Sequence, residues 1–185
     1  MSELLKLIIF VVATGGLVCF SWKSLPNPRS HGFYRFFAFE AILIIVLLNI
    51  DYWFYEPFSL HQVISWVLLI ASLFLVVHGF QLLRIVGKPG SERNDASLIG
   101  IEKTTELVKV GAYRYIRHPM YSSGLCGAWG VFFKHPSWVG FCLVVITTFF
   151  WTIASKIEEA ENISFFGTVY QDYMKQTKMF IPFLF

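Results

Sequence analysis

Charged residues are scarce in this chain. Of its 185 residues, 15 are Lys or Arg and 12 are Asp or Glu, so that 15% are charged, whereas 56% are hydrophobic and 18% aromatic. A soluble domain of this size needs far more polar side chains to cover its core. The composition therefore excludes an ordinary soluble protein, and a net charge of +3 is too small to indicate a nucleic-acid-binding surface.

The sequence also lacks the motifs of common metal and cofactor sites. Cys19, Cys126 and Cys142 fall in or beside apolar segments without metal-ligand spacing, so we expect small buried hydrophobic residues and no metal site. No G-x-G-x-x-G motif of a Rossmann domain is present. No Gly/Ser linker, low-complexity segment or repeat divides residues 1–185, which indicates a single domain.

Long apolar runs, in contrast, occupy most of the chain. They cover residues 4–21, 33–54, 60–83, 120–133 and 138–155. A helix needs roughly 20 apolar residues to cross a bilayer, so the pattern predicts an all-α integral membrane protein with about five transmembrane helices. The first run lacks a small-residue cleavage site and is expected to be retained. The fourth run is short, begins at Pro119, and forms a helical hairpin with the fifth over 120–155.

A few residues within these runs are interpreted as structural. A stripe of small residues in the fourth run predicts close packing against other helices, and its members are Gly124, Gly127, Ala128 and Gly130. Asn49 and Asp51, near the end of the second run, are expected at the membrane interface.

The basic residues indicate the orientation. All Lys and Arg residues except Lys6 and Lys134 flank the first and third connections or follow the last run. By the positive-inside rule these regions face the cytoplasm. Three helices would precede a cytosolic loop at 84–119, and a cytosolic helix and tail would follow at 156–185. We expect a multi-pass protein of a cytoplasmic (inner) membrane or an endomembrane.

A first polar island, GAYRYIRHPMY at 111–121, lies just before the short fourth run. Pro119 pushes the backbone of His118 toward an extended conformation at the start of the helix. The free N–H groups of the first turn then favour an anion in front of them. Arg117 adds a forked cation suited to a carboxylate or a phosphate. An interfacial anchor would explain Arg117 alone, but the cluster as a whole indicates a site.

A second polar island, EEAENISFFGTVYQDY at 158–173, follows the last run. It is expected to form a helix from about residue 156 to 165 that resumes after Gly167. Helical spacing places Glu158, Glu161 and Phe165 on one face, and a second face carries Glu159, Phe166, Tyr170 and Tyr173. A carboxylate at a membrane edge needs a donor, such as Arg117, Lys156 or the hydroxyls of a ligand. Arg117 and Lys156 are therefore the candidates for positioning substrate or charge.

The C-terminal half resembles a known family. RHPMY at 117–121 is preceded by ELVKVGAYRY and followed by the pair Glu158-Glu159, the pattern FG-x-x-Y-x-x-Y and a terminal FIP. In this order the motifs resemble the integral-membrane methyltransferases related to isoprenylcysteine carboxyl methyltransferase and phospholipid N-methyltransferases. The resemblance covers about residues 102–185, whereas the N-terminal helices match only as apolar spans.

The resemblance implies S-adenosylmethionine as the methyl donor, bound at the cytosolic face between the loop before the fourth helix and the C-terminal helix. Carried over by position, its cofactor contacts would be Glu106, Leu107, Val108, Tyr113, His118, Pro119, Met120, Tyr121, Glu158 and Glu159. These side chains suit the ligand: apolar groups for adenine, a carboxylate for the ribose hydroxyls, and aromatic faces for the sulfonium.

The sequence departs from the family pattern beside the acidic pair. Relatives that methylate a carboxylate have an arginine one turn before the pair, where this chain has Ala154. Lys156 is a point charge and faces elsewhere on the helix, so it cannot replace that arginine. This departure argues against a prenylcysteine carboxylate as substrate. Asn162 replaces the leucine usual after the pair, which we interpret as a packing change.

The leading hypothesis is methyl transfer from S-adenosylmethionine to a lipophilic acceptor that enters from the bilayer, either isoprenylcysteine-carboxylate-like or phospholipid-amine-like. An NADPH-dependent membrane reductase of the sterol or steroid type and a non-catalytic lipid-binding protein are the alternatives. No residue stands out as a general base, and the sequence leaves the acceptor and the oligomeric state open.

Overall fold

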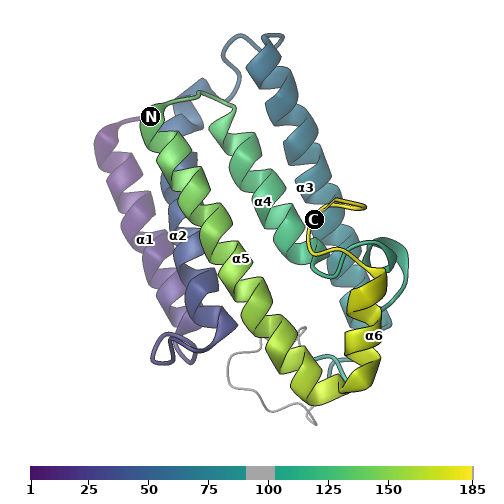
Figure 1. The fold of residues 1–185 in the computed structure, drawn as a ribbon. Coiled ribbons are helices and arrows are strands. Elements are labelled where there is room, and N and C mark those ends of the chain that lie inside the picture. The colour runs from purple at the N-terminus through teal and green to yellow at the C-terminus, as the bar shows by residue number, and fades with distance from the viewer. Residues whose placement is uncertain (91–102, 185) are drawn as a thin grey trace.

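The computed structural model describes residues 1–90 and 103–184. Within these residues all the named elements are helices (Figure 1): α1 (Glu3–Ser21), α2 (His31–Asn49), η1 (Ile50–Tyr52), α3 (Leu60–Ile85), η3 (Gly111–Arg114), α4 (Pro119–Phe132), α5 (Trp138–Phe166) and α6 (Thr168–Gln176). The predicted all-α class is confirmed for this part of the chain. Residues 91–102 of the predicted loop 84–119, including Arg93, lie outside the described residues.

The five longest helices form one bundle. α2 packs against α1 and α5, and α4 packs against α3 and α5. The connections that precede α2 and α4 lie at the same end of this bundle, where α5 projects and α6 packs (Figure 1). We call this the α6 end. The opposite end, which carries Met1 and the connections 50–59 and 133–137, is the N-terminal end.

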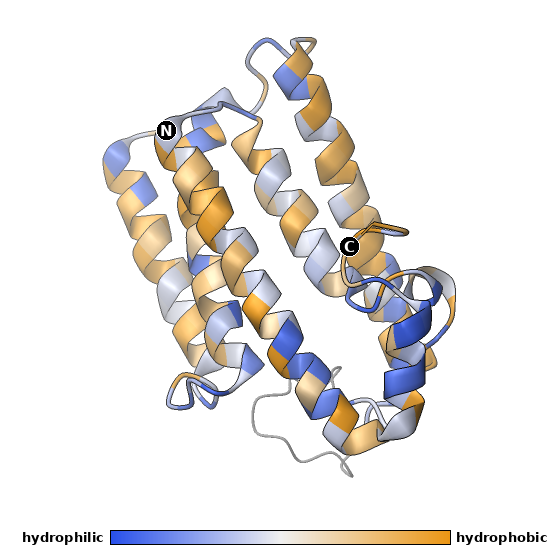
Figure 2. Ribbon diagram, viewed as in Figure 1, coloured by the Kyte–Doolittle hydropathy of each residue, from blue (hydrophilic) through white to orange (hydrophobic). Residues whose placement is uncertain are grey.

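Four helices are long and apolar enough to cross a membrane. They are α1, α2 with η1, α3 and α5. α4 has 14 residues, which corresponds to about 21 Å at 1.5 Å per residue and is shorter than the ~30 Å hydrocarbon core. The chain is therefore an integral membrane protein with four spans of sufficient length, and the expected fifth span is a short helix held within the bundle. Apolar residues cover these helices in Figure 2.

Many apolar side chains point outward, as expected where lipid replaces water. Cys19 on α1 and Cys142 on α5 are exposed, and Cys126 on α4 is half-buried. The expectation of buried cysteines is therefore wrong for Cys19 and Cys142. A small apolar side chain is as stable against lipid as inside the protein.

The small residues of α4 allow close helix packing, as expected. A Cβ atom on Gly124 would lie 2.9 Å from the Trp151 ring of α5, and one on Gly130 would lie 2.9 Å from the Leu69 side chain of α3. Either contact would force the helices apart. The absent Cβ atoms therefore allow the short helix to sit between its two longer neighbours.

Polar residues at the N-terminal end are used within the fold. Asn49 is buried and donates to the carbonyl of Val131 2.8 Å away, near the end of α4, so its side chain serves the fold, and its interfacial position stays a prediction. Lys134 is 1% exposed, with its Nζ 3.1 Å from Oε1 of Gln62 and 3.3 Å from the centroid of Trp66. Asn49 thus gives the Val131 carbonyl a second partner besides the N–H of Lys134, and the Lys134 ammonium is held by side chains.

α5, with 29 residues, is longer than one membrane crossing requires. It runs to Phe166 and ends at Gly167, whose φ of +62° is readily adopted by glycine. α6 begins at Thr168 and turns back toward the bundle. The predicted helix after the last span, with a break at Gly167, is thus confirmed, and the second island occupies the projecting end of α5 and α6.

Candidate active site

The first polar island is fixed against α3. Gly111 has φ of +59°, and a Cβ atom there would lie 2.5 Å from Nε2 of His78. The N–H of the next residue, Ala112, donates to the same Nε2 at 3.3 Å. Only glycine combines this backbone conformation with such a close approach. The turn places η3, and with it Tyr113, over the end of α3.

The segment after η3 pairs with the C-terminal tail. The N–H groups of Arg117 and His118 donate to the carbonyls of Lys178 and Met179 at 2.8 and 3.2 Å. The hydroxyl of Ser122 donates to the carbonyl of Phe180 at 2.9 Å. The tail therefore holds the start of α4 in place. The backbone of His118, with φ of −123° and ψ of 61°, is non-helical but less extended than Pro119 predicted.

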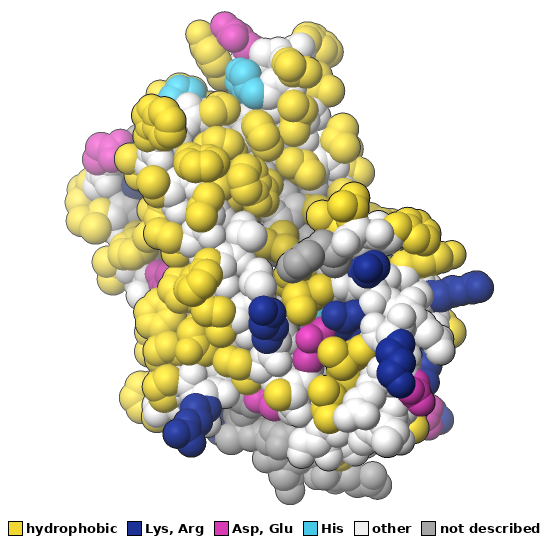
Figure 3. Space-filling view, in the orientation of Figure 1, with side chains coloured by type: hydrophobic (Ala, Val, Ile, Leu, Met, Phe, Trp, Pro, Cys, Tyr) yellow, Lys and Arg dark blue, Asp and Glu magenta, His cyan; other side chains and the backbone are white. Residues whose placement is uncertain are grey.

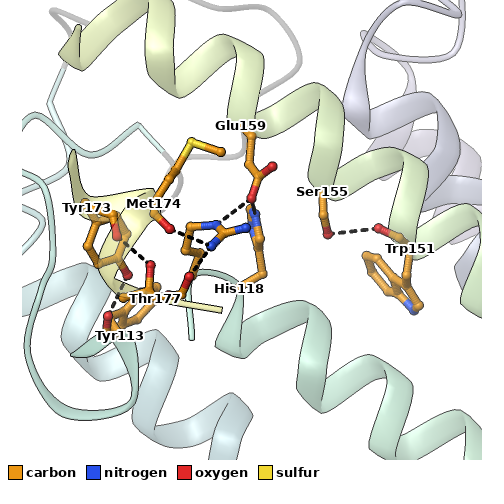
Figure 4. A network of polar contacts seen from close by, with 9 residues as sticks. Tyr113, His118, Trp151, Ser155, Glu159, Tyr173, Met174 and Thr177 are labelled. Carbon is orange, nitrogen blue, oxygen red and sulfur yellow. Dashed lines mark hydrogen bonds and ion pairs between the residues drawn. The ribbon is translucent and has the colours of Figure 1, made fainter. Parts of the chain in front are cut away.

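Arg117 joins the two islands. Its Nε lies 2.6 Å from Oε1 of Glu159, and its Nη1 donates to the carbonyls of Met174 and Thr177 (Figure 4). Nε2 of His118 lies 3.4 Å from the same carboxylate oxygen. The guanidinium thus connects the start of α4, the end of α5 and the end of α6. Its N–H groups are used in bonds within the protein, so few of them remain to bind a substrate carboxylate.

A cavity lies between the two islands. It contains about 610 Å³ of space free of atoms, including the part that is open to solvent. Its lining combines apolar, aromatic and polar side chains: Leu83, Thr104, Leu107, Val108, Tyr113, Arg117, His118, Met120, Tyr121, Glu158, Asn162, Phe166, Tyr170 and Tyr173. In Figure 3, Lys, Arg, Asp and Glu side chains gather around this end, and the rest of the visible face is mainly apolar.

Two tyrosines of α6 form one wall. The Tyr173 hydroxyl donates to the carbonyl of Tyr113 at 2.6 Å, which ties α6 to η3 (Figure 4). Burial raises the pKa of Tyr173 above its ordinary value. Burial, followed by the negative charge of Glu158, likewise raises the pKa of Tyr170. Both hydroxyls therefore stay protonated at neutral pH, and the proton of Tyr173 is used in its bond to Tyr113.

The structure brings together eight of the predicted site residues as lining of the cavity: Leu107, Val108, Tyr113, Arg117, His118, Met120, Tyr121 and Glu158. Four others lie outside the lining. Glu106 is exposed and accepts a 2.8 Å bond from Lys88. Pro119 is buried at the first turn of α4, Lys156 is exposed on α5, and Glu159 lies behind the lining as the partner of Arg117.

Six lining residues were not among the predicted site residues: Leu83, Thr104, Asn162, Phe166, Tyr170 and Tyr173. Four of these lie on α5 and α6, and helical spacing gave a signal for Phe166, Tyr170 and Tyr173 because it placed them on a shared face. Asn162 follows Glu158 by one turn, so its place in the lining could also have been predicted. Leu83 and Thr104 come from the end of α3 and the loop, where no local pattern marks them.

A second, apolar groove lies beside the cavity. It contains about 910 Å³ of atom-free space, again including the open part, and is lined by Leu68, Ser122, Leu125, Cys126, Trp129, Phe133, Thr148, Thr152, Phe180 and Ile181. None of these residues is charged at neutral pH. The hydroxyls of Ser122, Thr148 and Thr152 all donate to backbone carbonyls. The groove therefore offers mainly apolar surface.

The two hollows meet at His118 and Phe180. His118 lines the cavity and Phe180 lines the groove, and their ring centroids are 6.2 Å apart. Tyr121, also in the cavity lining, stacks on His118 at 5.4 Å. Within the described residues, no group of three or more His, Cys, Asp or Glu side chains is arranged to hold a metal ion.

Four apolar spans, with a polar cavity and an adjoining apolar groove toward one end, define an integral membrane protein with a candidate site at that end. The model of the phospholipid methyltransferase family matches residues 60–161, which is more than half of the chain and includes the RHPMY segment and both glutamates of the acidic pair. The chain therefore belongs to this family of membrane methyltransferases, which confirms the predicted resemblance.

Curated relatives carry a more specific name. The chain is 29% identical over 181 residues to a methanethiol S-methyltransferase of Crocosphaera subtropica, a match that covers 88% of this chain and 64% of that protein. It is 26% identical over 156 residues to the methanethiol S-methyltransferase of Pseudomonas deceptionensis, a match that covers 75% of this chain and 56% of that protein. The chain thus spans less than two thirds of the length of these relatives. No solved structure matches it.

Proposed function

We propose that this chain transfers a methyl group from S-adenosylmethionine to a neutral, lipophilic acceptor that reaches the site from the bilayer. The observation that carries the proposal is the cavity between the two polar islands, which presents Glu158 among aromatic side chains and adjoins an apolar groove. The basic residues of the connections at the α6 end support a cytosolic position for this cavity.

The lining fits the cofactor by its chemistry. Glu158 can accept hydrogen bonds from the two ribose hydroxyls, and Leu107, Val108 and Leu83 offer apolar surface to adenine. Faces of Tyr113 and Tyr121 suit a sulfonium cation. Pro119 at the first position of α4 leaves the following N–H groups pointing out of the helix end, which favours the methionine carboxylate.

The bound cofactor would supply an electrophilic methyl group on a positively charged sulfur. An acceptor would take this methyl group with loss of its bond to the sulfonium sulfur, and the acceptor's own proton would have to leave. In such an in-line displacement the protein mainly aligns the partners and excludes water. His118 is a titratable side chain that lines the cavity and also contacts Phe180 of the groove, so it is well placed to receive that proton.

The surroundings argue against an anionic acceptor. The Arg117 guanidinium is already bonded to Glu159 and two carbonyls. Ala154, at the position where carboxylate-methylating relatives have an arginine, is fully buried among Ala38, Tyr121 and Trp151. A carboxylate or phosphate in the groove would meet no charged lining residue, and burying it there would cost several kcal/mol.

An uncharged nucleophile fits these surroundings, and a thiol is the acceptor we favour. A thiol is weakly polar, so that it partitions into an apolar groove, and its thiolate is a strong nucleophile. The names of the matching relatives, methanethiol S-methyltransferases, support this choice. The reductase and the non-catalytic lipid-binding protein are less well supported because the family match is to methyltransferases.

Competing acceptors test the proposal. Purified protein would be incubated with methyl-labelled S-adenosylmethionine and, separately, with short and long alkanethiols, a prenylcysteine and vesicles of phosphatidylethanolamine. We expect labelled thioether from the thiols, no labelled ester from the prenylcysteine, and little labelled lipid amine. Labelled ester or methylated lipid as the main product would overturn the neutral acceptor, and the absence of transfer to any of them would count against the enzyme itself.

A further inference from the structure

The projecting end of α5 is held from two sides. On one side, Glu159 binds Arg117 and His118. On the other, Oε2 of Glu161 lies 2.7 Å from Nδ1 of His31, a residue 130 positions earlier in the chain. His31 is the first residue of α2 and is fully buried. α2 lines neither the cavity nor the groove, so this contact reaches the site only through α5.

Helix geometry relates the two contacts to the cavity. At about 100° per residue, Glu159 and Glu161 point in directions roughly 200° apart around α5. Glu158 lies between these directions and lines the cavity. The two flanking carboxylates are thus attached to different neighbours, and together they set the rotation of the helix that presents Glu158. Loss of either attachment lets the projecting end turn.

We propose that His31 is a positioning residue for the cofactor site, acting through Glu161 to hold Glu158 toward the cavity. This inference rests on the proposed function, because it concerns the affinity for S-adenosylmethionine. α2 and α5 also pack through ring contacts deeper in the bundle, such as Phe39 on Trp151 with ring centroids 5.2 Å apart. Those contacts hold the helices together, whereas the hydrogen bond from His31 fixes the orientation beyond them.

The position of His31 is itself well supported. Ser30 caps α2 by accepting a bond from the N–H of Gly32 at 3.1 Å, which stabilises the first turn. One turn further, Arg35 is buried as well, with its guanidinium 5.7 Å from the Phe20 ring centroid of α1. α5 is therefore attached to the first turn of α2, which is itself held in place.

Calorimetric titration with S-adenosylmethionine would test the inference on wild type, His31→Ala, Glu161→Gln and the double variant. Because Glu161 is partly exposed, Glu161→Gln is the milder change. We expect each single variant to weaken cofactor affinity about fivefold, as for residues that act through another element. The double variant should be no weaker than either single one, and kcat at saturating cofactor should stay near wild type. His31→Gln, which keeps an N–H donor, should restore part of the affinity.

Two reference variants distinguish a failure of this inference from a failure of the proposed function. Asp51→Ala removes an ion pair at the N-terminal end and should leave cofactor affinity unchanged, while Glu158→Ala should weaken it. Single-variant affinities within twofold of wild type, while Glu158→Ala loses binding, would overturn the role of His31 alone. Losses that add in the double variant would overturn it as well. A wild-type protein that does not bind S-adenosylmethionine would overturn the proposed function, and this inference with it.

Discussion

Both ends of the bundle carry charged residues, but they use them differently. At the N-terminal end, Lys134 is bonded to Gln62 beside two tryptophans, and Asp51 pairs with Lys6 and the amino terminus. At the α6 end, Arg117 and Glu159 pair in a similar way. Within the described part of the chain, however, no hydrogen bond or ion pair holds the carboxylate of Glu158, which faces the cavity.

The difference shows what distinguishes a site from an anchor in a membrane protein. Polarity at the edge of a membrane indicates function only where a polar group remains available after the fold has used its neighbours. The α6 end meets this condition because its ion pair fixes the helices around a cavity. The N-terminal end does not meet it, since Lys134 is bonded to Gln62 and Asp51 is paired with Lys6.

The largest effect is expected at the ion pair of the α6 end. Arg117→Ala leaves the buried Glu159 carboxylate without its main partner and separates α4, α5 and α6. The free energy of unfolding should fall by about 3 kcal/mol, and cofactor binding should be lost as well. Thermal unfolding in detergent and calorimetry would measure the two. Arg114→Ala, which removes an exposed cation nearby, is the control, and equal effects of both variants would contradict this role.

A comparable change at the N-terminal end should affect stability alone. Lys134→Ala removes a buried hydrogen bond to Gln62 and a cation–π contact with Trp66. We expect a loss of about 2 kcal/mol in the free energy of unfolding. The affinity for S-adenosylmethionine, measured on the protein that remains folded, should not change. A drop in affinity as large as the one in Arg117→Ala would break the distinction between the two ends.

The smallest of these effects is expected in the groove. Cys126→Phe places a ring in the apolar lining and should lower kcat/KM for a long-chain thiol about tenfold. Methanethiol should be affected less because it does not fill the groove, and the cofactor affinity should remain at its wild-type value. Cys142→Phe adds the same ring to an exposed position of α5. If both variants reduced turnover equally, the groove would not be the acceptor route.

Much of the fold could be predicted because apolar runs determine where helices cross a membrane. The first and third predicted runs begin at most one residue from α1 and α3, and the break at Gly167 was readable from the glycine. The span count was harder, since α4 is apolar but short. Burial of Asn49 and Lys134 could not be predicted, because each depends on a partner far away in the sequence.

The candidate site, like the fold, could be predicted only in part from the sequence. The RHPMY segment and Glu158 were found from motifs, and Glu158 and all of the segment except Pro119 line the cavity. The pairing of Arg117 and His118 with the tail at Lys178 and Met179 left no sequence signal, because it is made by backbone groups. The contact between His31 and Glu161 was also hidden, since nothing in the sequence marks His31 and 130 positions separate it from Glu161.

The central claim is that Glu158 faces a cofactor site and is not part of a membrane anchor. Calorimetric titration of wild type, Glu158→Ala and the exposed control Glu3→Ala with S-adenosylmethionine tests it most directly. The account predicts saturable binding to wild type and Glu3→Ala, and an affinity at least about tenfold weaker for Glu158→Ala, the loss expected for hydrogen bonds to a charged group. The melting temperature without cofactor should be unchanged. Equal affinities for all three proteins, or no binding by any of them, would contradict the account.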